Sequence, residues 1–420
     1  MRLEKLKKEA NCIVFYIRII NFAMIKHYEI IRRIVNSMKA RILLLMVVAM
    51  HLCAVARGER AVPGVIVAPA FSAGHVQGIA VDIKDSVVYL SYTTMIAKVD
   101  FRGHLIGTAT GLAGHLGCLD FNDSDGCVYG SLEYKDDAIG RGILKRLGST
   151  TRYSNAFYVA RIDGRRITRE GMDAARDGIM TVACLPEVLG DYSDTVTTGG
   201  RRLAHRYACS GIDGICVGPR IGSRKSEGQY VTVAYGVYGD TTRTDNDYQV
   251  IRQYSLASLR PYFRTLTPEA PVYEGPARSD VLCFVHTGNT DWGVQNLEYD
   301  RSSGLWFMAV YRGKKSRFPN YNLYAFSQSS PLRKQRLTGV DYERGKHYVL
   351  PLAAGELSDP ATGVTGWMKP AGGCFGLHSL GDGLFYVADI YKDRDGRQGA
   401  RIRLFGYDPS TRHFTRLITD

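Results

Sequence analysis

The sequence lacks the patterns that mark several common classes of protein. None of its nine cysteines forms a C-x-x-C pair or a Cys/His cluster with zinc-ligand spacing, so the sequence predicts no structural zinc. The stretch at residues 122–126 does not have the register of a calcium-binding loop, and we interpret it as a turn. No block of Lys and Arg and no basic helix follows residue 56, which argues against a nucleic-acid partner.

The total charge of +13 does not alter that conclusion, because about half of it lies near the N-terminus. Residues 1–56 carry ten Lys and Arg against three Asp and Glu, a net charge of +7, which leaves +6 for the rest of the chain. Hydrophobic residues make up 45% of the sequence and charged residues 23%. This composition is typical of a folded globular protein and excludes a disordered, collagen-like or coiled-coil chain.

Residues 38–56 have the features of a secretory signal peptide. A basic start precedes an apolar run at residues 42–52, and an A-x-A pattern ends at Ala56. This pattern predicts cleavage after Ala56 and a secreted, periplasmic or cell-surface protein. A membrane-spanning helix is one alternative, although the apolar run is short for a bilayer. A lipid anchor at Cys53 is another, and it is the one route by which we expect membrane association.

The leader divides the chain into segments with different expected roles. We expect Met38 to be the native start, residues 1–37 to lie outside the native chain, and residues 57–420 to form a single domain. Seven cysteines follow the leader, an odd number that excludes complete pairing within the chain. Cys118 and Cys127 flank a predicted hairpin and could face each other across it, and buried free thiols are the alternative.

A repeat extends over residues 78–391. Each of five segments begins with a glycine and a short apolar strand, passes through a polar turn, and ends in a strand of aromatic and β-branched residues. These segments are residues 78–92, 117–134, 214–235, 293–311 and 376–391. Two further strand candidates follow each pair, and such recurring units of four antiparallel strands are typical of a β-propeller.

We therefore predict an all-β protein, a β-propeller with five four-stranded blades. Six or seven blades remain possible, and a β-sandwich is the alternative fold. The repeat glycines are unevenly spaced, so we expect long loops at residues 172–210, 265–290 and 343–373, with at most a short helix near residues 181–189. A strand at residues 64–68 could complete the last blade and close the ring. We expect a monomer.

In a propeller the first strand of each blade lines the central channel, and the loops leading into these strands meet on one face. The candidate ligand-binding residues at or just inside this channel mouth are His75, Gln77, His115, Asp213, Trp292, Gln295 and His378. The loops that follow the second strands add Lys135, Tyr311, Arg312 and Lys392. Cations bind carboxylate or sulfate groups and aromatic rings pack on sugar rings, so this combination predicts an acidic carbohydrate as the ligand.

Two histidines are the candidate catalytic residues. His75 and His115 occupy equivalent blade positions, and histidine is suited to acid–base chemistry near neutral pH. A metal site built on these two residues and His378 is conceivable, but nothing in the spacing requires it, and we predict neither a metal nor a cofactor. A pair of carboxylates for hydrolysis could come from Asp213, Asp291 and Glu298.

Part of the sequence resembles a known group of enzymes. Residues 75–82, 89–94, 98–103 and 114–117 look like the opening blades of secreted bacterial β-propellers that act on acidic glycans, among them rhamnosyl-glucuronate hydrolases and lyases. The resemblance implies a catalytic role for His75, with Gln77 beside it. Residues 293–321 are similar to an uncharacterised group of secreted bacterial propellers, which implies no activity.

These observations predict a secreted propeller that binds an acidic carbohydrate, and they leave open whether it also cleaves it. A polysaccharide lyase would use His75, His115 or a nearby tyrosine as base, with Arg312 or Lys135 neutralising the uronate carboxylate. A glycoside hydrolase would need a carboxylic acid or histidine at the glycosidic oxygen. The alternative from another class is a non-enzymatic scaffold that binds a protein or glycan at the cell surface.

Overall fold

The computed structural model describes residues 24–29, 32, 62–150, 153–223, 228–267, 270–368 and 373–418. The predicted leader at residues 38–56, with Cys53, lies outside these ranges. The chain divides into two units, Met1–Val62 and Pro63–Asp420. The described part of the first unit is helical over residues 24–29. No helix in the described part of the chain combines the length and the apolar character that a bilayer crossing needs.

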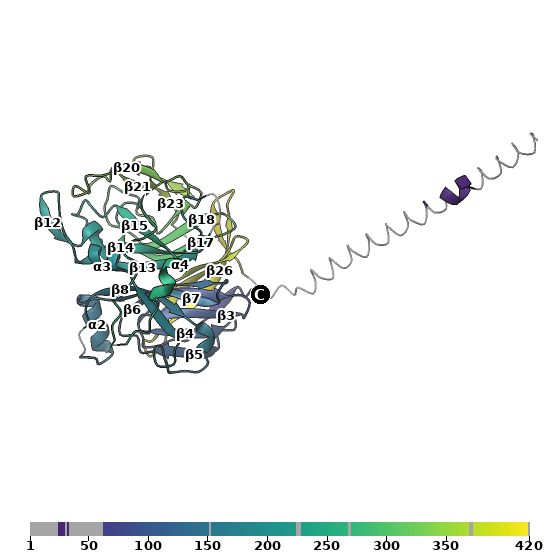
Figure 1. Cartoon of the computed structure of the whole chain (residues 1–420), viewed down its shortest axis with the longest axis horizontal. Coiled ribbons are helices and arrows are strands. Elements are labelled where there is room, and N and C mark those ends of the chain that lie inside the picture. The colour runs from purple at the N-terminus through teal and green to yellow at the C-terminus, as the bar shows by residue number, and fades with distance from the viewer. Residues whose placement is uncertain are drawn as a thin grey trace, which may run out of the picture. The chain divides into compact units, whose positions relative to one another are not determined.

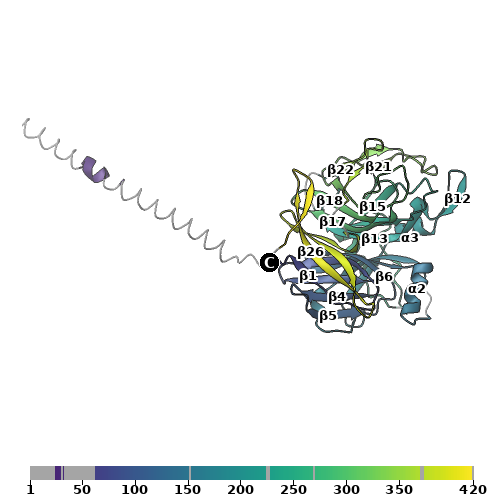
Figure 2. The same ribbon diagram turned by 180° about the vertical axis from the view of Figure 1, so that it is seen from behind.

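The second unit is a five-bladed β-propeller, as the repeats predicted (Figures 1 and 2). Its inner strands, one per blade, are β2 (Val76–Asp82), β6 (His115–Asn122), β13 (Cys209–Gly218), β17 (Asp291–Asp300) and β24 (Leu377–Gly381). Each inner strand contacts the next one around the ring, and β24 contacts β2. The five strands therefore enclose a central channel.

Every predicted repeat is an antiparallel pair of first and second strands. The second strands are β3 (Val87–Tyr92), β7 (Cys127–Tyr134), β14 (Tyr230–Val237), β18 (Leu305–Tyr311) and β25 (Leu384–Lys392). The third strands are β4 (Met95–Asp100), β8 (Ala156–Ile162), β15 (Tyr248–Ser255), β19 (Leu323–Ser327) and β26 (Gln398–Asp408).

The outer strands depart from a uniform four-stranded blade. Blades one to three continue with β5 (Leu105–Thr110), β10 (Met180–Cys184) and β16 (Val281–His286), and short strands extend two of these sheets: β9 (Met172–Asp173), β20 (Arg333–Gln335) and β21 (His347–Leu350). Blade four has three strands among the described residues. Its outer edge is covered instead by the chain near β22 (Leu357–Ser358) and β23 (Thr365–Gly366), where Trp367 exchanges backbone hydrogen bonds with Leu323.

The ring is closed by the start of the domain, as the sequence predicted. Strand β1 (Val65–Val67) pairs antiparallel with β26, with Ile66 opposite Ile402, and β27 (His413–Arg416) pairs with the other half of β26. In Figure 2 the yellow C-terminal strands lie beside β1. Ile66 is completely buried while Val65 and Val67 on either side are exposed. The two ends of the domain thus complete one blade together.

The hydrophobic core lies between neighbouring blades. Aromatic and branched side chains from facing sheets form separate clusters: Tyr89 and Leu119 belong to the one between blades one and two, and Phe307 and Phe385 to the one between blades four and five. Crowding near the axis explains the repeat glycine. A Cβ atom on Gly78 would lie 2.7 Å from the Cα of Cys118 on the next inner strand, so only glycine fits there.

The predictions for the long gaps between repeats were wrong in detail. Residues 180–184 form strand β10, and the helix expected near residues 181–189 is α3 (Pro186–Ser193), which begins with proline in the first helical turn. The predicted loops at 265–290 and 343–373 contain β16 and β21–β23. These short segments show no clear alternation of apolar and polar residues in the sequence. Their strand conformation depends on pairing with the neighbouring blade, which local sequence does not reveal.

The remaining elements are short, apart from one unpredicted helix. They are α2 (Ala138–Arg146), the hairpin β11 (Thr195–Thr198) and β12 (Arg201–Ala204), α4 (Leu256–Leu259), and 3-10 turns at Gly164–Arg166, Arg206–Ala208, Arg260–Tyr262 and Gly373–Phe375. The seven cysteines after the leader are all free. Cys127 lies opposite Asn122 in the hairpin, so the possible disulfide to Cys118 does not form and the buried-thiol alternative is correct.

Candidate functional site

A pocket of about 590 Å³ lies at the channel mouth. Side chains from the first four blades line it, and the fifth blade contributes Gln398. Eight of the eleven predicted site residues meet there, namely His75, Gln77, His115, Lys135, Asp213, Trp292, Gln295 and Tyr311. Asp291, predicted as one of the possible carboxylates, lines the same pocket. This volume is within the range of small-molecule binding sites.

Three predicted ligand-binding residues lie elsewhere. The exposed Arg312 donates a hydrogen bond from Nε to the carbonyl of Asn320 at 2.8 Å. Lys392 is exposed at the end of β25. His378 is buried inside the channel, where it faces Asp120 and Glu298 instead of His75 and His115. A three-histidine metal site is therefore excluded, and Glu298 is separate from the other two candidate carboxylates.

Irregular strand pairing orients three of the pocket residues. A register shift between an inner strand and its partner occurs at each of Gln77, Asp213 and Gln295. The residues on either side pair with the second strand, whereas these three residues have no partner in it. Such bulges rotate a side chain out of the regular in-and-out alternation. The equivalent shifts in three blades turn polar side chains towards the channel mouth, and the sequence contains no separate signal for them.

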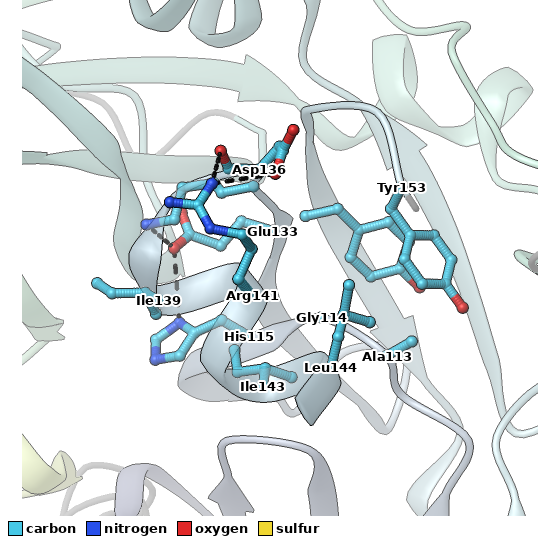
Figure 3. A pocket seen from close by; sticks show the side chains of 13 residues that line it. Ala113, Gly114, His115, Glu133, Asp136, Ile139, Arg141, Ile143, Leu144 and Tyr153 are labelled. Carbon is cyan, nitrogen blue, oxygen red and sulfur yellow. Dashed lines mark hydrogen bonds and ion pairs between the residues drawn. The ribbon is translucent and has the colours of Figure 1, made fainter. Parts of the chain in front are cut away.

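A cluster of ionisable side chains forms one wall of the pocket. Nδ1 of His115 lies 3.7 Å from Oε1 of Glu133 and 3.6 Å from Oδ1 of Asp213. Figure 3 shows His115 directed towards Glu133. Lys135 forms a buried ion pair with Glu133 and donates a hydrogen bond to the carbonyl of Ser210 at 2.8 Å. Because the ammonium group of Lys135 already pairs with Glu133, we do not assign this cluster as a metal site.

Burial changes the proton affinity of each group in this cluster. It lowers the pKa of His115 to about 3, with Lys135 and His75 contributing, so the imidazole is neutral. It acts to raise the pKa of Glu133, against the opposing effect of the paired Lys135, and it raises that of Asp213 to about 6. Burial opposes the charge of Lys135, but Glu133 and Asp213 raise its pKa above the ordinary value.

Asp213 is the carboxyl group of this cluster best placed to reach a ligand. Its side chain is 13% exposed, compared with 2% for Glu133. Gln295 Nε2 donates a hydrogen bond to Oδ2 of Asp213 at 3.0 Å and also bonds the carbonyl of Trp292 at 3.2 Å. A carboxyl group held in this way, with a pKa near 6, can donate a proton close to neutral pH.

Helix α2 supplies the residues that the sequence interpretation missed. Asp137 caps the helix by accepting a hydrogen bond from Gly140, and Ala138, Ile139, Gly142, Ile143 and Arg146 line the pocket. A capping aspartate, apolar residues four positions apart and basic residues in the last turn are recognisable helix signals, which Gly140 and Gly142 weaken. The helix also borders a second pocket of about 270 Å³, which contains Tyr153 (Figure 3).

His75 and Arg146 also line the pocket. Burial lowers the pKa of His75, and the positive charge of Arg146 lowers it further. Gln77 beside it donates a hydrogen bond to Oγ1 of Thr93 at 3.3 Å. The ring of Phe375 lies 5.9 Å from that of His75 and 5.8 Å from that of Tyr311. An imidazole and a guanidinium group thus lie close to each other in the pocket.

Trp292 adds an aromatic surface in an unusual backbone conformation. Its φ angle is +65°, a left-handed conformation that is rare for a bulky residue, and its side chain is 38% exposed. The ring meets Tyr238 edge-on at 5.8 Å. Strained residues in exposed positions are concentrated at functional sites, and an accessible indole is a common surface for stacking against sugars.

These features define a five-bladed propeller with a ligand-sized pocket at its channel mouth. No known family and no curated protein matches the sequence. Among solved structures, the computationally designed Ika4 protein is 12% identical, with a TM-score of 0.22 over 62% of this chain and 96% of that chain. A protein of unknown function from Bacteroides caccae is 8% identical, with a TM-score of 0.27 over 68% and 88%. Neither likeness bears on activity.

Proposed function

We propose that the channel-mouth pocket binds an acidic carbohydrate and cleaves its glycosidic bond, with Asp213 as the proton donor. The observation that carries this proposal is the raised pKa of Asp213 in the wall of a pocket that also presents Trp292. A protonated carboxyl group can protonate the leaving oxygen of a glycosidic bond. The predicted leader supports a secreted protein, where polysaccharides are accessible, and we propose that it acts as a monomer.

The remaining polar groups of the pocket have distinct roles in this proposal. Arg146 binds the carboxylate or sulfate of the sugar, which replaces the roles first assigned to Arg312, Lys392 and Lys135. Trp292 stacks on the sugar ring. Gln295 is a positioning residue that holds Asp213 through a hydrogen bond, and His115 packs against the same carboxyl group. Asp291, whose Oδ2 accepts a bond from Lys314 at 2.6 Å, is the second carboxylate of a hydrolytic reaction.

A lyase reaction is the second candidate, and the proximity of His75 to Arg146 favours it. A neutral imidazole can remove the proton α to a uronate carboxylate, and a guanidinium group beside it makes that proton more acidic by neutralising the carboxylate. The product distinguishes the two reactions, because elimination leaves an unsaturated uronate and hydrolysis leaves a saturated sugar.

The test is incubation of the protein with a panel of uronate-containing and sulfated polysaccharides, followed by mass spectrometry and by the absorbance of unsaturated uronates. Saturated products that are lost with Asp213→Asn support hydrolysis, and unsaturated products that are lost with His75→Ala support elimination. Asp240→Asn, on an exposed loop, is the matched control. Binding without any product would overturn cleavage and support the non-enzymatic scaffold, with a glycan ligand.

A separate pair of variants tests whether the ligand is acidic. Arg146→Ala should weaken binding of an acidic oligosaccharide by about tenfold or more, since a hydrogen bond to a charged group contributes roughly 1.5–3 kcal/mol. Arg141→Ala should not, because Arg141 lies on the side of α2 that faces the smaller pocket and pairs with Asp136. Equal binding by both variants would contradict the role of Arg146.

A further inference from the structure

A second cluster of ionisable side chains lies inside the channel, separate from the pocket. Asp120 of β6, Glu298 of β17 and His378 of β24 come from three different blades. Nδ1 of His378 lies 3.6 Å from Oδ1 of Asp120 and 3.7 Å from Oε2 of Glu298. The three side chains are only 4–7% exposed. They therefore meet in the protein interior, across the channel axis.

Each side chain is held by the backbone and directs one remaining atom to the centre of this cluster. Asp120 uses Oδ2 to accept a hydrogen bond from the backbone N–H of Val217 at 2.6 Å. Glu298 uses Oε1 to accept one from Ser379 at 2.9 Å. The ring of His378 bonds the backbone of Val81. Nδ1 of His378 and Oε2 of Glu298 are buried and have no hydrogen-bond partner.

No basic side chain in the described part of the chain pairs with the two carboxyl groups. Among the residues that the structure describes, no Lys or Arg forms an ion pair with Asp120 or Glu298, and their ion-pair contacts are with His378 alone. This differs from the cluster at the channel mouth, where Lys135 contacts Glu133. Two neighbouring buried carboxyl groups are costly to keep ionised without a cation, and their unpaired polar atoms are costly in either protonation state. A ligand with two positive charges would remove this cost.

We propose that Asp120, Glu298 and His378 form a binding site for a divalent metal ion, and that zinc matches this ligand set best. Ligands about 2.1 Å from a tetrahedral zinc ion lie roughly 3.4 Å apart, close to the observed separations. Imidazole and carboxylate oxygen are both common zinc ligands. Backbone hydrogen bonds to the outer atoms of all three residues match the usual support of metal ligands.

The metal ion links blades that are not all neighbours in the ring. Asp120 belongs to the second blade, Glu298 to the fourth and His378 to the fifth, so one ion connects them through the centre. Binding to the folded state alone stabilises the fold. The inference does not depend on the proposed carbohydrate function, because none of these three residues lines the pocket at the channel mouth.

The first test uses the whole protein after treatment with a chelator and dialysis. Zinc, manganese and calcium are added separately, bound metal is measured by elemental analysis, and unfolding is followed by circular dichroism. We expect one zinc ion per chain and an unfolding temperature higher by several degrees. No stoichiometric binding of any of the three ions, with an unchanged unfolding temperature, would overturn the proposal.

Isosteric and control variants locate the bound ion. Glu298→Gln keeps the shape of the side chain, and we expect it to weaken zinc binding by at least about 100-fold. His378→Ala should bind no zinc, whereas the matched control His286→Ala, a histidine outside the cluster, should bind it normally. If His378→Ala does not fold, the zinc affinity of Glu298→Gln alone tests whether the ion binds at this cluster. Zinc binding that survives in Glu298→Gln but is lost in His115→Ala would contradict the assignment.

The sign of the stability change is a further readout. With chelator present, Glu298→Gln should unfold at a temperature no lower than that of the unchanged protein, because it replaces a buried carboxyl group that no basic side chain among the described residues compensates. With saturating zinc, Glu298→Gln should unfold at a lower temperature than the unchanged protein. A role in simple packing would give the same sign under both conditions, which would overturn the proposal.

Discussion

Oδ1 of Asp213 lies 3.6 Å from Nδ1 of His115, and this contact joins the inner strands of the second and third blades at the channel mouth. Lys135 and Glu133 border it on one side and Gln295 on the other. The buried imidazole is neutral, so it does not favour ionisation of Asp213. The acid–base character of the pocket thus arises from desolvation, which only the assembled ring provides.

This environment predicts an unusual dependence of stability on pH. Burial raises the pKa of Asp213 from 3.8 to about 6, although Lys135 and Gln295 oppose the rise. This shift in pKa corresponds to a free energy of about 3 kcal/mol. The folded state therefore binds this proton more tightly than the unfolded state, so its contribution is favourable at low pH and is lost between about pH 4 and pH 6. Asp213→Asn should be more stable than the unchanged protein at pH 7 and similar at pH 4, as measured by urea unfolding.

Asp240→Asn is the control for that measurement and should show the opposite sign. Hydrogen bonds from Thr242 lower the pKa of Asp240, so its ionised form stabilises the fold above the unfolded-state pKa and loses that effect as the pH falls. A loss of stability in Asp213→Asn at pH 7 would show that Asp213 is ionised and favourably paired, contrary to its proposed role.

The backbone strain at Trp292 predicts a separation of stability from binding. Its left-handed conformation costs an ordinary residue about 1–2 kcal/mol but costs glycine little. Trp292→Gly should therefore be about 1 kcal/mol more stable than Trp292→Ala, and both variants should lose the proposed carbohydrate binding equally. Chemical denaturation and binding titrations measure the two effects. Equal stability of the two variants would show that the backbone relaxes when the indole is removed.

The crowding at the channel axis predicts a large cost for a single methyl group. In Gly78→Ala the new carbon would lie 2.7 Å from the Cα of Cys118 and from the backbone nitrogen of Leu119. We expect a loss of about 2–3 kcal/mol in the free energy of unfolding. Gly142→Ala in helix α2 has open space around it and should instead gain about 0.5–1 kcal/mol. Comparable stabilities of the two variants would contradict the packing argument.

The closure of the ring predicts that the short strand β1 contributes strongly to stability. Ile66 is completely buried against the last blade, and Ile66→Ala should lower the free energy of unfolding by about 2–5 kcal/mol. Val65→Ala, on the exposed face of the same strand, should change it by less than about 0.5 kcal/mol. Thermal unfolding of the pair measures the difference, and equal effects would mean that β1 does not hold the blades together.

The five repeat segments and the closing strand could be predicted from the sequence because their information is local. A glycine, an alternating strand and a hairpin turn occur within about twenty residues in each blade. The same reasoning identified eight residues of the pocket, since propeller loops converge on one face. It failed for Arg312, Lys392 and His378, because blade position alone does not specify where a side chain points.

The sequence by itself determined that the chain forms β-hairpins with repeated turns, and hence a propeller, because hydrophobic alternation and turn residues act over a few positions. Only the tertiary structure decided the environments. The bulges that turn Asp213 and Gln295 into the pocket, the burial that raises the pKa of Asp213, and the meeting of Asp120 with Glu298 and His378 all depend on contacts between distant blades. Such contacts exist once five sheets close around one axis, since desolvation and proximity are properties of the assembled ring.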